Sequence, residues 1–329
     1  MNTFKAYRTF DDNGVVSSHF VNASIDELDA GDVVVRTKYS TINYKDALSH
    51  NGTGKIMRKY PTIAGIDMAG TVEASGDARF KKGDKVIVHG YDMGVAHDGG
   101  YAEHVRVPAD WVVPIPEGLT PLDVMTIGTA GFTAALSVIE MERNGLSPEK
   151  GPVIVAGATG GVGSIAVECL SARGYAVTAL TGKAHAEEFL RTLGAKDVLQ
   201  RNTLQMGTRP LEKATWAGAV DPVGGEILAW LTRTMAYGGC IASSGLTAGT
   251  ELKTTVLPFI LRGVKLLGID SVMCPTETRL EVWRRLATDL RPAHLGRIAN
   301  TIGLDGLPAA FTAILKGEAQ GRYVVRLRD

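Results

Sequence analysis

The sequence predicts an α/β protein with two domains, a small irregular β-barrel and a doubly wound parallel sheet. With 329 residues, the chain is long enough for two domains that each bury a core. Its first third consists of short β-rich segments separated by turns. From about residue 127, helical patterns alternate with compact apolar segments, which is typical of a parallel sheet covered on both faces.

Charge and cysteine content limit the partners and the compartment. Lys+Arg and Asp+Glu are both 35, so no net field attracts nucleic acid or an anionic membrane. The N-terminal segment MNTFKAYRTFDDNG carries charges where a signal peptide is apolar, and no run approaches the ~18 apolar residues of a membrane span. The cysteines Cys169, Cys240 and Cys274 form no C-x-x-C pair, which excludes a disulfide framework. We therefore expect a cytoplasmic protein that binds a small molecule, and neither nucleic acid nor a membrane.

The expected strands fall into two groups. Those of the barrel lie in DVVVRTKYST, GTVEAS, GDKVIVHG and GYAEHVRVP. Those of the parallel sheet lie in PVIVAG, YAVTAL, AGAVDPVG, GGCIASSG and VKLLGID. After Ser271, two helical stretches and a final strand, GRYVVRLRD, are expected to return to the first domain. We therefore predict one domain from residues 1–126 and 271–329, and a second from residues 127–270.

A glycine-rich turn marks the expected cofactor site. The strand Val153–Ala156 runs into a turn that contains Gly157, Thr159, Gly160, Gly161 and Val162, and a helix follows at once. A turn without bulky side chains lets backbone N–H groups and a helix N-terminus approach a pyrophosphate. The spacing is G-x-x-G-x-x-G, so a tight strand-to-helix turn without a ligand is the alternative. The surrounding alternation of strands and helices favours dinucleotide binding.

The end of the next strand indicates which dinucleotide. Thr181, Gly182 and Lys183 stand where an NAD enzyme places a ribose-binding acid, and no acid is present there. A hydroxyl and an ammonium suit a 2′-phosphate instead, and Arg201 follows the next apolar segment. We therefore expect NADPH; the alternative is that Lys183 and Arg201 are solvated surface charges.

Longer segments resemble a known family. GIDMAG at Gly65–Gly70, DGGYAEHVRVP, GTAGFTAAL and GATGGVG resemble the medium-chain dehydrogenases/reductases and occur in the same order. INYKDAL, GKIMRKYP, WAGAVDPVGG and TTVLPFILRGV are similar to the zinc-free, quinone-oxidoreductase-like branch that contains NADPH-dependent acryloyl-CoA reductases. The resemblance implies a GroES-like barrel, a Rossmann domain and reduction of the carbon–carbon double bond of acryloyl-CoA. It also implies removal of toxic acryloyl-CoA in dimethylsulfoniopropionate or three-carbon metabolism, and a homodimer in which VKLLGI pairs at the sheet edge.

The sequence lacks the zinc ligands of the family's alcohol dehydrogenases. Those enzymes have Gly-His-Glu where this chain has Gly65-Ile66-Asp67, and the N-terminal half has no cysteine. His50, His89, His97 and His104 remain, but histidines without clustered Cys or acidic partners are more often surface or hydrogen-bonded residues than metal ligands. We therefore expect no metal, and enoyl reduction rather than alcohol oxidation.

The resemblance also implies where the substrate and the nicotinamide bind. It places Asn43, Tyr44 and Asp46 beside the nicotinamide. Tyr44 either gives the proton to the α-carbon, with water as the alternative acid, or holds the cofactor, or only packs. Asn43 and Asp46 either orient the ligands or cap a turn.

The resemblance implies further site residues. By it, Leu246, Ile269 and Ser271 are expected to line the nicotinamide half, and Arg322 to meet a phosphate or to seal the cleft. Lys55 and Arg58 either bind the phosphates of CoA or are solvated surface charges.

The alternative functions are a broader quinone or enone reductase and a noncatalytic NADPH-binding protein.

Overall fold

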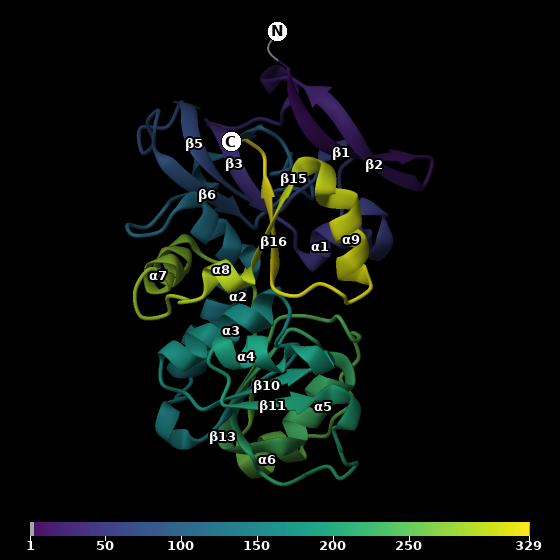
Figure 1. Ribbon diagram of the computed structural model, residues 1–329, viewed down its shortest axis with the longest axis vertical. Coiled ribbons are helices and arrows are strands. Elements are labelled where there is room, and N and C mark those ends of the chain that lie inside the picture. Colours follow the sequence, from purple (N-terminus) through teal and green to yellow (C-terminus); the bar gives the residue numbers. More distant parts are fainter. Residues whose placement is uncertain (1–2, 329) are drawn as a thin grey trace. The chain divides into compact units, whose positions relative to one another are not determined.

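The computed structural model describes residues 3–328, which form two units (Figure 1). Unit 1 contains the described residues up to Thr129, together with Val272–Leu280 and those from Ile298 onward. Unit 2 contains Ala130–Ser271 and Glu281–Arg297. Each unit is described below by itself.

Unit 1 is the irregular β-barrel, as the sequence predicts. Its helices and strands are β1 (Phe4–Asp12), β2 (Val15–Ala23), β3 (Val33–Thr41), α1 (Tyr44–His50), β4 (Thr62–Ile63), β5 (Asp67–Ser75), β6 (Lys85–His89), β7 (His104–Val107), β8 (Val112–Pro114), β15 (Ala299–Gly303), α9 (Leu307–Leu315) and β16 (Arg322–Arg326). A seven-stranded sheet has the order β15-β16-β3-β5-β6-β8, with β7 paired to β3, and a smaller sheet has the order β2-β1-β4. Alternate residues of β3, such as Val33 and Val35, point into the core.

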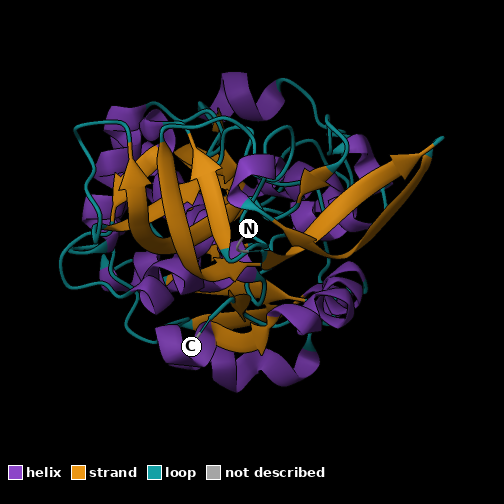
Figure 2. Ribbon diagram, turned by 90° about the horizontal axis from the view of Figure 1, so that it is seen from above, coloured by secondary structure: helices purple, strands orange, loops and turns teal. Residues whose placement is uncertain are grey.

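A hairpin formed by β1 and β2 was not among the expected strands. Its turn is Asn13-Gly14, and both residues have positive φ, 55° and 88°. Such a pair is suited to the tight turns that match the twist of antiparallel strands. Figure 2 shows the hairpin as a long pair of orange strands that projects from the rest of unit 1.

Unit 2 is the doubly wound sheet. Its elements are β9 (Val153–Val155), α3 (Gly161–Ala172), β10 (Val177–Thr181), α4 (Glu187–Thr192), β11 (Asp197–Gln200), β12 (Trp216–Asp221), α5 (Gly225–Thr234), β13 (Met235–Ser243), α6 (Leu257–Arg262) and β14 (Lys265–Gly268). The strands are parallel and have the order β11-β10-β9-β12-β13-β14. This order places the glycine-rich turn after β9 at the centre of the sheet.

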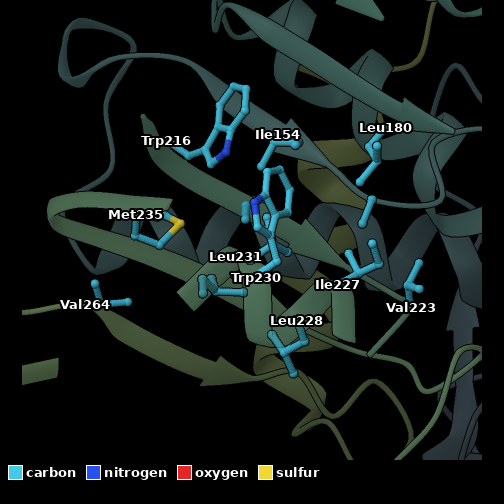
Figure 3. Packing of buried hydrophobic residues seen from close by; sticks show 13 residues of the cluster. Ile154, Leu180, Trp216, Val223, Ile227, Leu228, Trp230, Leu231, Met235 and Val264 are labelled. Carbon is cyan, nitrogen blue, oxygen red and sulfur yellow. The ribbon is translucent and has the colours of Figure 1, made fainter. Parts of the chain in front are cut away.

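Apolar side chains hold α5 against the sheet of unit 2. Ile154 and Ile241 of the strands contact a cluster that includes Trp216, Trp230 and Leu231 (Figure 3). The rings of Trp216 and Trp230 meet edge to face with their centroids 6.5 Å apart. This core fixes the carboxyl ends of β9 and β12, where the glycine-rich turn and the turn before α5 begin.

Three helices contain residues of both units: α2 (Pro121–Arg143), α7 (Thr276–Leu286) and α8 (Leu295–Ile298). The expected helix around residue 127 begins earlier, at Pro121, and has a non-helical break at Gly128. A window of α2 has a mean hydropathy of 1.5, so this helix is long and apolar enough to cross a membrane, and the sequence analysis overlooked it. Because 89% of that window is buried, α2 equally fits a core helix of a soluble protein.

Candidate active site and cofactor turn

The first turn of α1 presents Tyr44. Asn43 is the N-cap residue, and its backbone N–H donates to Asp46 Oδ2 at 2.8 Å. Ala47 packs with Leu307 and Phe311 of α9, which fixes the buried face of α1. Tyr44 is 36% exposed and Asp46 only 1%. Tyr44 is therefore accessible, whereas the side chains of Asn43 and Asp46 on either side of it are buried.

Asp67 lies behind this turn at the start of β5 and is fully buried. Its carboxylate accepts from Thr41 N at 3.2 Å and Thr41 Oγ1 at 2.6 Å, and from Asn43 Nδ2 and Thr129 N, both at 3.0 Å. Both oxygens of this buried carboxyl group are therefore satisfied by N–H or O–H donors. Sequence reasoning missed this role, since it used the Gly65-Ile66-Asp67 motif only to exclude zinc.

Arg322 is the cation of the same network and is 3% exposed. Its Nη1 donates to Ile42 O at 3.2 Å and to Asn43 Oδ1 at 3.1 Å, while Nη2 donates to Thr41 Oγ1 at 2.7 Å. Nη2 lies 3.9 Å from Asp67 Oδ2. These contacts turn the guanidinium toward Asp67 and the N-cap of α1. Phosphate binding by Arg322 stays a prediction.

Asp46 is the second buried carboxyl of the network. Its Oδ1 accepts from Ile66 N at 3.1 Å, and its Oδ2 also lies 3.2 Å from Asn43 Nδ2. Burial, followed by the charge of Asp67, raises the pKa of Asp46 to about 7, although the Asn43 and Ile66 hydrogen bonds oppose the shift. This carboxyl therefore titrates near neutral pH.

The glycine-rich turn in unit 2 has the geometry that a pyrophosphate requires. Gly157 has a φ of 57°, and a Cβ on Gly163 would lie 2.3 Å from Gly157 O. Gly160 is the N-cap of α3, which begins at Gly161 and continues through Val162 for 12 residues in all. Bare backbone thus surrounds the N-terminus of a full-length helix, where anions bind.

The residues expected at the 2′-phosphate lie together at the end of β10. Thr181 Oγ1 lies 3.4 Å from Thr159 Oγ1 and accepts from Lys183 N at 3.1 Å. A Cβ on Gly182 would lie 3.1 Å from Arg201 Nη2, so the guanidinium reaches the backbone of this turn. Burial lowers the pKa of the Lys183 ammonium. These side chains can supply a hydroxyl and two cations to one phosphate.

The expected nicotinamide residues lie at the ends of β13 and β14. Leu246 is exposed; Ile269 N donates to Ser243 O at 3.0 Å, and the buried Ser271 Oγ accepts from Thr133 Oγ1 at 2.8 Å. The neighbouring Ser244 Oγ is buried and has no hydrogen-bond partner among the described residues. A buried hydroxyl of this kind is suited to a polar group of a ligand.

The expected CoA-binding cations do not share one environment. Lys55 lies on an exposed turn with a φ of 50°. Arg58 pairs with Asp92, and the neighbouring Lys59 pairs with Asp29. Lys55 is therefore better placed than Arg58 to meet an added phosphate.

Four histidines of unit 1 have hydrogen-bonding or ion-pair partners. His50 bonds the Tyr7 hydroxyl, His89 bonds Arg279, His97 bonds backbone carbonyls and His104 meets Glu73. Over residues 3–328 we find no group of three or more His, Cys, Asp or Glu side chains that could hold a metal ion. The local chemistry of Asp67 is instead that of a carboxylate saturated by N–H and O–H donors.

Comparison with known proteins gives matches along nearly the whole chain. Residues 29–117 match the model of the alcohol dehydrogenase GroES-like domain, and residues 161–288 match the model named zinc-binding dehydrogenase. The "Acrylyl-CoA reductase AcuI" of Ruegeria pomeroyi is 47% identical over 96% of this chain and 96% of its own length. The "Putative quinone oxidoreductase YhfP" of Bacillus subtilis is 51% identical over 95% of both chains.

Two solved structures are similar over their full length. The yhdH oxidoreductase from Salmonella enterica in complex with NADP has a TM-score of 0.95 and 45% identity, covering 98% of this chain and 100% of that one. The Bacillus subtilis protein yhfP with NAD bound has a TM-score of 0.96 and 49% identity, covering 99% and 100%.

Proposed function

This chain belongs to the medium-chain dehydrogenase/reductase superfamily, and from that premise we propose that it reduces acryloyl-CoA to propanoyl-CoA with NADPH. The observation that carries the proposal is the 47% identity to an acrylyl-CoA reductase over 96% of both chains. The chain is an NADP-dependent oxidoreductase by the same relationships. The identity of the substrate, acryloyl-CoA, is the element of the proposal that the experiment below tests.

The reaction balances with one hydride and one proton. CH₂=CH–CO–SCoA takes a hydride at its β-carbon and a proton at its α-carbon, which gives CH₃–CH₂–CO–SCoA and NADP⁺. The thioester carbonyl withdraws electrons from the double bond, so the enzyme mainly has to position the reactants and supply a proton. NADPH, when bound, supplies the hydride.

The residues of unit 2 fit this cofactor. The turn Gly157–Gly163 and the N-terminus of α3 would hold the pyrophosphate, and Thr181, Lys183 and Arg201 would hold the 2′-phosphate. The buried Ser244 hydroxyl fits a polar group near the nicotinamide. Absence of an acidic residue at Thr181–Lys183 favours NADPH over NADH.

Tyr44 is the proposed proton donor for the α-carbon. It is accessible, while Asn43 and Asp46 of the same turn are buried and hydrogen-bonded. Asn43 and Asp46 then act by holding the first turn of α1. Lys55 is the proposed contact for a CoA phosphate. Arg58 is expected to contribute less, because it already pairs with Asp92.

An exposed apolar patch supports the proposal of a homodimer. Val256, Ile260 and Leu261 of the α6 region and Leu266 of the edge strand β14 are all exposed. An edge strand with apolar neighbours is suited to pairing across a two-fold axis. Light scattering should give the mass of a dimer, and the double variant Ile260→Glu, Leu266→Lys should give the mass of a monomer.

We also propose a cytoplasmic location and a role in removing acryloyl-CoA during dimethylsulfoniopropionate or three-carbon metabolism.

A broader quinone or enone reductase is the second candidate, favoured by the 51% identity to a protein named putative quinone oxidoreductase. NADPH oxidation should be followed with purified protein and equal concentrations of acryloyl-CoA, crotonyl-CoA and a simple benzoquinone. The proposal predicts the highest kcat/KM with acryloyl-CoA. Turnover confined to the quinone would establish the second candidate, and cofactor binding without turnover would favour a noncatalytic role.

A further inference from the structure

The polar network of unit 1 buries two carboxyl groups but has one guanidinium. Asn43 Nδ2 links them, since it lies 3.2 Å from Asp46 Oδ2 and 3.0 Å from Asp67 Oδ2. Arg322 is the cation whose contacts with this network the structure records. If both carboxyl groups were ionised, a buried network would carry one uncompensated negative charge, which is strongly unfavourable.

The guanidinium lies on the side of Asp67, so we place the negative charge on that carboxyl group. Asp67 accepts from four N–H or O–H donors and lies 3.9 Å from Arg322 Nη2. Asp46 accepts from three N–H groups and interacts with the Tyr101 hydroxyl, which itself donates to Thr41 O at 2.9 Å. The Tyr101 oxygen can therefore accept a hydrogen bond, and a protonated Asp46 can donate it.

Within residues 3–328, the contacts that the structure records give the remaining ionisable groups around α1 other partners or exposed positions and place no second counter-charge on the network. On the far side of Asp46, His50 bonds the Tyr7 hydroxyl at 2.9 Å. The packed helix α9 (Leu307–Leu315) contains no ionisable side chain. The turn that follows α1 carries the exposed Lys55, β2 carries His19, and Lys45 is on α1 itself.

We propose that Asp46 is a positioning residue that carries a proton during turnover, and that its neutral carboxyl fixes Asn43 and the first turn of α1, from which Tyr44 projects. The link to turnover rests on the proposed function. The neutral acid can accept from Asn43 N and Ile66 N and still has a proton to donate to the Tyr101 oxygen. Ionisation of Asp46 places a second negative charge against Asp67 and loosens the turn that carries Tyr44. A pKa of about 7, raised by burial and by Asp67, agrees with this assignment.

The pH profile of kcat tests the proposal. The wild-type enzyme should lose kcat with acryloyl-CoA as the pH rises through about 7, with the slope of one ionisation. Asp46→Asn has no proton to lose, so its kcat should stay within about threefold over the same range. A falling limb that persists unchanged in Asp46→Asn would overturn the proposal, because Tyr44 or water would then account for it.

Carboxyl NMR tests the proton itself, without substrate. Protein labelled with ¹³C at the aspartate carboxyl carbons should show a signal that titrates near neutral pH and that remains in Asp221→Asn. This control is needed because burial also raises the pKa of Asp221, to about 6. Loss of this neutral-range signal in Asp46→Asn would assign it to Asp46. If Asp46→Asn does not fold, absence of a neutral-range signal in Asp221→Asn would still overturn the proposal. A neutral-range signal in a protein that does not reduce acryloyl-CoA would support the protonation of Asp46 and refute the proposed function.

Discussion

Gly128 lies directly against Arg322. A Cβ on Gly128 would come within 2.5 Å of Arg322 Nη2 and 3.2 Å of Asp67 Oδ2, and the residue has a φ of 54°. The break in α2 therefore brings Thr129 N to the Asp67 carboxylate, just before the chain enters unit 2. This glycine couples the backbone of α2 to the buried polar network.

Gly128→Ala should destabilise the protein for two reasons. The new methyl group meets a buried guanidinium, and the positive φ adds strain of about 1–3 kcal/mol. The midpoint of urea unfolding should fall. Gly317→Ala is the matched control, because Gly317 has a φ of 72° and nothing within 4 Å of an added Cβ. An equal fall in the unfolding midpoint of the two variants would show that the contact of the added methyl group with Arg322 does not add to the destabilisation.

Replacement of Lys183 or Arg201 should change the choice of cofactor. Each side chain can make a charge-assisted contact worth about 1.5–3 kcal/mol, so Lys183→Ala or Arg201→Ala should raise the KM for NADPH roughly tenfold to a hundredfold. The KM for NADH should change little. Lys213→Ala, at an exposed position of unit 2, is the control. A similar rise for both cofactors would mean that these cations do not contact the 2′-phosphate.

Tyr44→Phe distinguishes proton transfer from simple contact. Loss of a general acid should lower kcat about 10²-fold or more, with the KM for NADPH nearly unchanged. Tyr237→Phe, at a side chain that is 78% exposed, should have no effect. A rise in the KM for NADPH with kcat preserved would instead assign Tyr44 to holding the cofactor, and water would be the acid.

The substrate's phosphates can be tested at Lys55. Lys55→Gln should raise the KM for acryloyl-CoA severalfold and leave the KM for NADPH alone, because an ammonium-phosphate contact is lost. Arg58→Gln should have a smaller effect, since Asp92 already pairs with Arg58. Lys82→Gln controls for the loss of an exposed charge on unit 1. If Lys55→Gln and Lys82→Gln have the same KM for acryloyl-CoA, the exposed turn that carries Lys55 does not bind CoA.

Stability should also depend on Asp46. Its folded pKa of about 7 lies above the ordinary value of about 3.9, so the folded state holds more protons than the unfolded state between these pH values. The contribution of Asp46 to stability is therefore fully present below about pH 4 and is lost as the pH rises through about 7. Burial lowers the pKa of His50 and His89, which act in the opposite direction. The difference in unfolding free energy between wild type and Asp46→Asn, measured as a function of pH, should report the contribution of the Asp46 carboxyl alone. A difference that does not change with pH would contradict the raised pKa of Asp46.

Local patterns predicted the barrel, the parallel sheet and the glycine-rich turn between β9 and α3. The turn around Gly157 and the helix after it lie within a few residues of one another, so sequence was sufficient. The start of α2 also had a local signal that was overlooked: Thr120 and Asp123 form reciprocal N-cap contacts, with Thr120 N donating to Asp123 Oδ2 at 2.9 Å and Asp123 N to Thr120 Oγ1 at 3.1 Å. Asn13-Gly14 was a comparable signal for the β1–β2 hairpin.

The buried network could not be found in this way. Arg322 reaches Thr41 and Asn43 across some 280 residues of chain, and no spacing rule connects them. The shared burial of Asp46 and Asp67 depends on the packing of α1 against α9 and on the pairing of β3 with β5. Only the folded chain brings these carboxyl groups to one guanidinium.

Transfer of deuterium from NADPH is the most direct test of the central claim. The enzyme should be supplied with acryloyl-CoA and NADPH labelled at the transferred position of the nicotinamide, and the product analysed by NMR. The expected product is propanoyl-CoA with one deuterium at the β-carbon and a solvent proton at the α-carbon. Label at the α-carbon, or oxidation of NADPH without formation of labelled propanoyl-CoA, would contradict it.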